Sequence, residues 1–173
     1  MLTTSPAAIS IEGRLIADAI GELGVTHIIS VPDTNLRTVI ELLEERAAPK
    51  VTYVCTEDEA MGINAGLYMT GHKPMLLIQN NGLFACLNTL KAMPLDAEVP
   101  TFMLIGQFGR DVNKSVEDNP RRAVHRLEPT LATWGVPYVR IDEPADVAKI
   151  RAAWDVAWTT NGPSAAIVGA PTR

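Results

Sequence analysis

The chain has 173 residues, of which 47% are apolar and 20% charged, and its formal net charge is −5. These proportions exclude an intrinsically disordered chain, and the negative charge argues against nucleic acid as a partner because no broad positive field attracts phosphates. No stretch has the roughly 20 apolar residues of a membrane-spanning helix, and residues 1–6 lack the layout of a signal peptide. We therefore expect one cytoplasmic domain over residues 1–173, with no membrane association.

Helix-like and strand-like segments alternate along the chain. Apolar stripes with helical spacing predict helices over residues 11–23, 36–43, 57–70, 82–92, 121–134 and 147–158. Short apolar runs predict six strands at residues 28–31, 51–54, 75–78, 100–105, 138–141 and 164–168. Helices that connect successive strands act as crossovers, so the sheet should be mostly parallel. The prediction is an α/β fold in three layers (α/β/α), with about six strands buried on both faces.

Local features add three expectations. Asp33 or Thr34 can cap the helix that follows it. Cys55 and Cys86 form no CxxC pair, and we expect both to be reduced, buried thiols of a cytosolic protein. Gly62 and Gly66 each cost about 1 kcal/mol of helix propensity relative to alanine, which indicates a close approach of backbone to another group. That group is either the domain's own sheet, or a subunit or cofactor.

Ligands of open parallel sheets collect at the carboxyl ends of the strands. The loops expected there cover residues 32–35, 55–58, 79–82 and 106–120. Glu57 opens a helix, where acidic residues are common because they meet the positive end of the helix dipole. Turn chemistry explains Asn81-Gly82, but it does not explain Gln79 and Asn80 at the mouth of a core strand. We therefore look for chemistry in these loops.

The run from Glu57 through an Ala- and Gly-rich helix to Thr70-Gly71-His72-Lys73-Pro74 resembles the pyrimidine-binding domain of thiamine-diphosphate enzymes. In that family a glutamate stands nine residues before a glycine, as Glu57 does before Gly66. The following Gln79-Asn80-Asn81-Gly82-Leu83 is similar to the Gln-Asn-Ser-Gly-Leu run of the sulfopyruvate and phosphonopyruvate decarboxylase type, and Val31-Pro32-Asp33 also fits. The resemblance extends from about residue 11 to 93.

This resemblance implies the α subunit of a heteromeric thiamine-diphosphate-dependent 2-oxo acid decarboxylase, a carboxy-lyase. Its substrate would be similar to sulfopyruvate or phosphonopyruvate, and its product an aldehyde or a carboligation product. Glu57 would be the catalytic residue, because a carboxyl group bonded to ring N1′ stabilises the imino tautomer of the aminopyrimidine. Such a carboxyl must be sheltered from water, since desolvation raises its pKa. Pro32, Asn81 and Gly82 would also bind the cofactor.

The family's second domain carries a Gly-Asp-Gly motif and holds Mg²⁺ and the diphosphate. This chain contains no Gly-Asp-Gly. The resemblance therefore implies that a β-type partner subunit carries the diphosphate-binding domain, and that Mg²⁺ is bound there and not by this chain. An αnβn assembly with shared cofactor follows.

Candidates for contact with the substrate are Asn35, Asn80, Arg110 and His125, although a solvated loop and helix start is the simpler interpretation of residues 106–126. Phe84 and Cys86 depart from the family pattern, which leaves a larger or aromatic 2-oxo acid open. His72, in the turn, is expected at the surface.

Three other functions compete with this one. The main alternative is a non-catalytic α/β binding or regulatory subunit with a decayed thiamine site. A dinucleotide-binding domain is disfavoured because this chain has no Gly-x-Gly-x-x-Gly loop after its first predicted strand. A cysteine hydrolase is disfavoured because the three histidines are scattered along the sequence.

Overall fold

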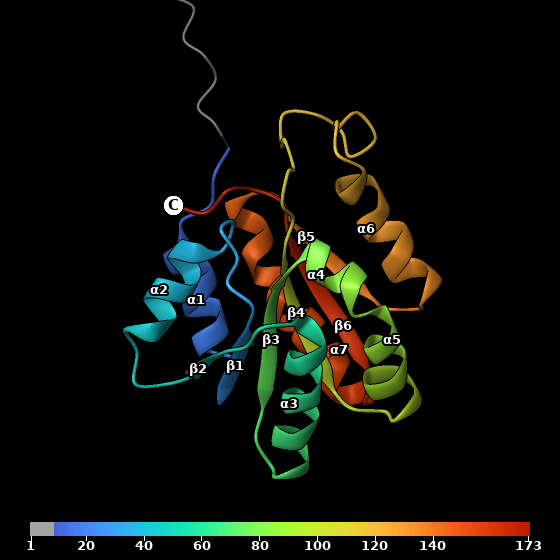
Figure 1. Cartoon of the computed structure of the whole chain (residues 1–173). Coiled ribbons are helices and arrows are strands. Elements are labelled where there is room, and N and C mark those ends of the chain that lie inside the picture. The colour runs from blue at the N-terminus through green and yellow to red at the C-terminus, as the bar shows by residue number, and fades with distance from the viewer. Residues whose placement is uncertain (1–8) are drawn as a thin grey trace, which may run out of the picture.

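The computed structural model describes residues 9–173, and its centre is one parallel sheet (Figure 1). The strands are β1 (His27–Ser30), β2 (Lys50–Tyr53), β3 (Pro74–Gln79), β4 (Thr101–Gly106), β5 (Tyr138–Ile141) and β6 (Pro163–Val168). Their order is β2-β1-β3-β4-β6-β5, and every neighbouring pair is parallel. The six predicted strands are all present, each shifted by no more than one residue at either end.

Helices cover both faces of this sheet, so the predicted three-layer α/β/α fold is confirmed. On one face lie α1 (Gly13–Gly21), α2 (Arg37–Glu44) and α7 (Lys149–Thr160), the last preceded by the 3₁₀ helix η2 (Pro144–Ala148). On the other lie α3 (Glu57–Met69), α4 (Asn80–Ala85), α5 (Leu87–Leu90) and α6 (Arg122–Thr133), with the π-helical turn η1 (Lys91–Asp96) after α5.

Two hydrophobic clusters, one on each face of the sheet, form the core. On β3, Met75 and Leu77 pack with α1, α2 and α7, whereas Leu76 and Ile78 pack with the opposite helices. This alternation follows from the two-residue period of a strand. The edge strands β2 and β5 are only partly buried, so the prediction of burial on both faces is wrong for these two. An edge strand has a neighbour on one side only, which leaves part of it open.

The segment after β3 differs from the single helix predicted over residues 82–92. Helix α4 begins already at Asn80, directly after the last residue of β3. It ends at Cys86, whose φ of −106° and ψ of 22° leave the helical region, and the chain resumes as α5. The π-helical turn η1 then contains Pro94, which cannot donate a helical hydrogen bond. The early start of α4 brings Gly82 close to the beginning of α3.

Two local expectations are corrected by the structure. Helix α2 has Leu36 at its N-cap with no side-chain hydrogen bond, so neither Asp33 nor Thr34 caps it. Cys86 is buried as predicted, but Cys55 is exposed because it follows the edge strand β2. His72 is exposed, as predicted.

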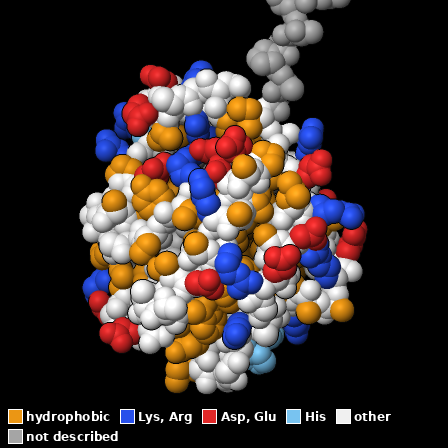
Figure 2. Space-filling view, turned by 180° about the vertical axis from the view of Figure 1, so that it is seen from behind, with side chains coloured by type: hydrophobic (Ala, Val, Ile, Leu, Met, Phe, Trp, Pro, Cys, Tyr) orange, Lys and Arg blue, Asp and Glu red, His pale blue; other side chains and the backbone are white. Residues whose placement is uncertain are grey.

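The surface carries charges of both signs. Figure 2 shows acidic and basic side chains interspersed on the face behind the view of Figure 1. Over residues 9–173, every helix is too short or too polar to cross a bilayer.

Candidate functional site

The start of helix α3 holds three consecutive acidic residues with different surroundings. The hydroxyl of Thr56 accepts a hydrogen bond from the backbone N–H of Glu59 at 3.2 Å, and the Glu59 carboxylate accepts one from the N–H of Cys55 at 2.9 Å. This reciprocal pair resembles a capping box and fixes the first turn. The Asp58 carboxylate accepts a hydrogen bond from the hydroxyl of Thr89. Glu57 differs, because no other residue within 9–173 donates a hydrogen bond to its carboxylate.

The carboxyl group of Glu57 lies directly against the α-carbon of Gly82. A Cβ atom added to Gly82 would stand 1.7 Å from Glu57 Oε1 and 2.0 Å from Cδ, so only glycine fits beneath this side chain. Glu57 is half-buried, and this desolvation raises the pKa of its carboxyl group. The charge of neighbouring Asp58 raises it further, against an opposing bond to the residue's own backbone. The carboxyl is thus suited to sharing a proton with a basic nitrogen.

A chain of hydrogen bonds connects the loops after β1 and β3. Asn81 Nδ2 donates to Gln79 Oε1 at 2.9 Å, and Gln79 Nε2 donates to Asp33 Oδ1 at 2.9 Å. The backbone N–H of Asn35 donates to the same oxygen at 3.0 Å. Asp33 is only 3% exposed, and this burial raises the pKa of its carboxyl, while the bonds from Gln79 and Asn35 lower it. We call Asp33, Gln79 and Asn81 the amide chain.

The end of β4 completes this arrangement through a second glycine. A Cβ atom on Gly106 would lie 1.8 Å from Asp33 Oδ2 and 3.3 Å from Asn35 Cβ. Gly106 is also the register partner of Gln79. The carboxyl ends of β1, β3 and β4 therefore converge.

Most of the predicted cofactor and substrate residues lie in this region. Glu57, Gly82, Asn81 and Asn35 lie at the same edge of the sheet, where chemistry was expected. Pro32 is exposed and lines a neighbouring hollow of about 330 Å³ with Asp33 and Tyr53. Sequence reasoning treated Asp33 as a helix cap, and it missed the contact with Gly106. The signal for Asp33 was its place two residues after the end of a predicted strand.

The remaining substrate candidates contact the segment that follows β4. Asn80 is buried, and its side chain bonds the backbone of Phe108 and Ala123 at 3.2 to 3.4 Å. Arg110 donates to the backbone carbonyls of Lys114 and Asp111, and the His125 ring contacts the carbonyl of Asn119. These contacts order residues 106–126 and do not bring the three side chains to Glu57. A direct role for them with substrate stays a prediction.

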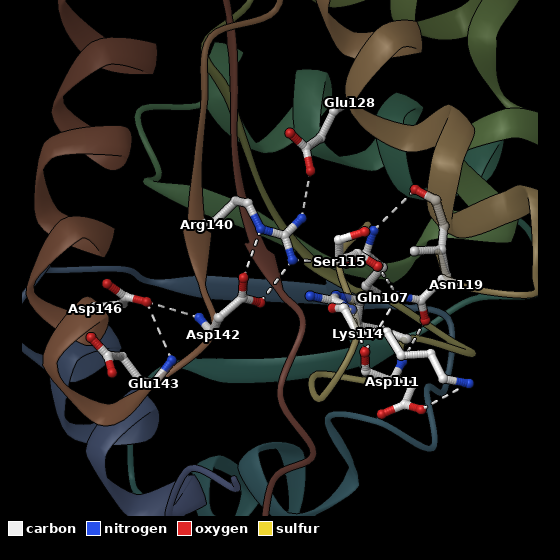
Figure 3. A network of polar contacts seen from close by, with 12 residues as sticks. Gln107, Asp111, Lys114, Ser115, Asn119, Glu128, Arg140, Asp142, Glu143 and Asp146 are labelled. Carbon is white, nitrogen blue, oxygen red and sulfur yellow. Dashed lines mark hydrogen bonds and ion pairs between the residues drawn. The ribbon is translucent and has the colours of Figure 1, made fainter. Parts of the chain in front are cut away.

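Arg140 on β5 centres an ion-pair network that sequence reasoning did not find (Figure 3). Its guanidinium donates to Asp142 at 2.7 and 2.8 Å, to Glu128 at 2.6 Å and to Gln107 at 3.2 Å. The pairing joins the edge strand β5 to α6 and to the end of β4. An arginine inside a predicted apolar strand was the available signal.

The comparisons with known proteins point to one group of relatives. Sulfopyruvate decarboxylase subunit alpha of Methanocaldococcus jannaschii is 32% identical over 94 residues, which cover 54% of this chain and 56% of the relative. The subunit of the same name from Methanothermobacter thermautotrophicus is 32% identical over 90 residues, covering 52% and 54%. That of Methanococcus maripaludis is 29% identical over 132 residues, covering 76% and 78%. The chain is similar in sequence to sulfopyruvate decarboxylase alpha subunits. This confirms the resemblance read from the sequence.

The matched segments cover only part of this chain and of each relative. The chain spans about half the length of the first two of these relatives. No protein-family model matches the sequence. Among solved structures, 2-oxoglutarate:ferredoxin oxidoreductase from Magnetococcus marinus has a TM-score of 0.68 at 15% identity, covering 92% of this chain and 29% of that one. At this identity the likeness concerns the fold alone.

Proposed function

We propose that the chain is the α subunit of a heteromeric thiamine-diphosphate-dependent 2-oxo acid decarboxylase, and that Glu57 binds the aminopyrimidine end of the cofactor. The observation that carries this proposal is the Glu57 carboxyl group, half-buried against Gly82 with a raised pKa and without a donor from another residue in 9–173. The similarity to sulfopyruvate decarboxylase alpha subunits supports the same assignment.

The residues present fit an aminopyrimidine ring. Thiamine diphosphate, when bound, supplies the nucleophilic carbon that adds to the keto group and the electron sink for loss of CO₂. Glu57 would hold a proton between its carboxyl and ring nitrogen N1′, which requires a carboxyl whose proton affinity is raised by desolvation. Gly82 leaves the space that this side chain occupies, so it positions the carboxyl. Pro32 and Asn81 would contact the cofactor from the neighbouring loops.

A partner subunit is proposed to bind the diphosphate and Mg²⁺ and to cover helix α3. Of the two alternatives for Gly62 and Gly66, close packing against their own sheet is not found, because a Cβ atom added to either meets nothing within 4 Å. Both glycines are exposed, and Met69 on the same helix is 78% exposed. This exposed stripe of small residues on α3 would let a β-type subunit approach closely, in an αnβn assembly.

The substrate class proposed is a small 2-oxo acid of the sulfopyruvate or phosphonopyruvate kind. The two departures from the family pattern lie in different places. Cys86 belongs to the core, where burial, together with the nearby charges of Asp58 and Glu57, raises its thiol pKa to about 12. Phe84 lines a hollow of about 400 Å³ with Arg122 and Arg126 of α6. Of these two residues, Phe84 is the one that we propose to affect substrate preference.

The test is a comparison of Glu57→Gln with Asp58→Asn in the complex purified with the candidate β subunit. Titration with thiamine diphosphate and Mg²⁺ should show binding by the complex and little by the isolated chain. Glu57→Gln should abolish decarboxylation while the subunits still co-purify, whereas Asp58→Asn, which alters the adjacent exposed carboxylate, should retain activity within a few-fold. Normal turnover in Glu57→Gln would end the assignment.

A further inference from the structure

The hydrogen bonds of the amide chain have a fixed direction. Asp33 Oδ1 receives the backbone N–H of Asn35, so it acts as an acceptor, and the NH₂ group of Gln79 points to it. The carbonyl oxygen of Gln79 must then face Asn81, and it receives the NH₂ group of Asn81. Asn81 cannot reverse its amide without losing this bond, and it retains its carbonyl oxygen and the second N–H of its NH₂ group. Asn81 is exposed, and no group within residues 9–173 donates to Oδ1.

The burial of the Asp33 carboxyl group lowers the stability of the fold. Its Oδ2 is buried without a hydrogen-bond partner in the described part of the chain and lies against the α-carbon of Gly106. A buried polar atom left unpaired costs about 1 to 3 kcal/mol. No basic side chain pairs with this carboxyl either, since its bonds come from an amide and a backbone N–H. A buried acid with such surroundings indicates a role in a binding site.

We propose that Asp33 is a positioning residue, which acts through Gln79 to hold Asn81 with its carbonyl oxygen directed outward as the acceptor for an N–H group of the bound ligand. Gln79 accepts one of the two N–H groups of Asn81, whereas the carbonyl oxygen receives no bond from residues 9–173. The ligand class is an aromatic or heterocyclic amine. The assignment of this amine as the amino group of the aminopyrimidine rests on the proposed function.

The first test needs no cofactor and uses the full-length chain. Asp33→Asn keeps an acceptor oxygen for Gln79, whereas Asp33→Leu keeps the branched shape of the side chain and removes that oxygen. Side-chain amide resonances in ¹⁵N-edited NMR should show Gln79 and Asn81 NH₂ groups that exchange slowly in the wild type and in Asp33→Asn. In Asp33→Leu their exchange should accelerate at least tenfold. Unchanged exchange in Asp33→Leu would overturn the proposal. Gly106→Ala, which pushes Asp33 away by its methyl group, should reproduce the Asp33→Leu result.

The second test measures thiamine diphosphate affinity in the complex with the β subunit. Asp33→Leu and Asn81→Ala should each weaken binding about tenfold, and Asp33→Asn should bind within threefold of the wild type. Because Asp33 acts through Asn81, the double variant Asp33→Leu/Asn81→Ala should be no weaker than either single variant. Additive losses would show that Asp33 does not act through Asn81. If the wild-type complex binds no thiamine diphosphate, the proposed function and the amine assignment fail together, while the NMR result still decides whether Asp33 orders Asn81.

Discussion

Two acidic side chains at the same edge of the sheet pack against glycines in nearly the same way, yet their surroundings differ. A Cβ atom on Gly82 would stand 1.7 Å from Glu57 Oε1, and one on Gly169 would stand 2.1 Å from Asp142 Oδ1. Asp142 is paired with Arg140 through two hydrogen bonds, whereas Glu57 receives none from another residue within 9–173. Close packing on glycine is thus common to both, and charge compensation distinguishes a structural carboxylate from a candidate catalytic one.

The two carboxylates also differ in what they connect. Arg140 forms ion pairs with both Asp142 and Glu128, and the pair with Glu128 joins strand β5 to helix α6. Burial of Glu57 without a cation raises the pKa of its carboxyl group. The first arrangement pairs its carboxylates with a cation, and the second raises the proton affinity of a carboxyl that has no cation beside it.

The largest expected effect comes from Gly82→Ala. This variant tests whether the contact of Glu57 with Gly82 serves cofactor binding, unlike the contact of Asp142 with Gly169. The added methyl group would displace the Glu57 carboxyl, and a misplacement of about 1 Å costs on the order of 100-fold in activity. The measurement is kcat and thiamine diphosphate affinity of the complex. Gly169→Ala is the matched control, because it collides with Asp142 and should leave cofactor affinity unchanged. Equal activity in the two variants would contradict the distinction.

Arg140→Met should affect stability instead of cofactor binding. Removing the guanidinium leaves Glu128 and Asp142 partly buried without their partner, which we expect to cost about 2 kcal/mol after allowance for partial exposure. Denaturant unfolding of the isolated chain measures this. A loss below about 0.5 kcal/mol would show that the network contributes no more than an exposed ion pair.

Gly62→Ala tests the exposed stripe on α3, the helix that Glu57 opens. Its Cβ atom meets nothing within 4 Å, so the isolated chain should gain up to about 1 kcal/mol from helix propensity. If this face meets the β subunit, the same variant should bind that subunit more weakly in a pull-down or calorimetric titration. Higher stability with unchanged association would place the interface elsewhere.

The smallest effect concerns the pH dependence of Glu57→Gln. The folded state raises the pKa of Glu57 above its ordinary value of 4.5, so the folded chain binds more protons than the unfolded chain in that window. Stability from this group is therefore full below pH 4.5 and declines as pH rises through the folded pKa. Relative to the wild type, Glu57→Gln should become more stable between pH 4.5 and 7, as measured by urea unfolding at both values. A difference independent of pH would contradict the raised pKa.

The sequence predicted the sheet well because its strands are apolar runs of distinctive length. The sequence was less informative where residues far apart in the chain determine the local conformation and contacts. Asn80 was placed in a loop over residues 79–82, but it is the first residue of α4, and its side chain bonds the backbone of Phe108 and Ala123. Gly82 looked like a turn glycine, and only the fold brings it beneath Glu57. Glu57 itself was found by resemblance, since helix-start chemistry would have favoured Asp58 and Glu59 equally.

Glu57 opens helix α3 in a half-buried position, so part of this residue is in contact with water. A protein surface that docks there would expel that water and strengthen the proton affinity of the carboxyl further. In the assembly that we propose, the arriving subunit would thereby set the acid strength of this group.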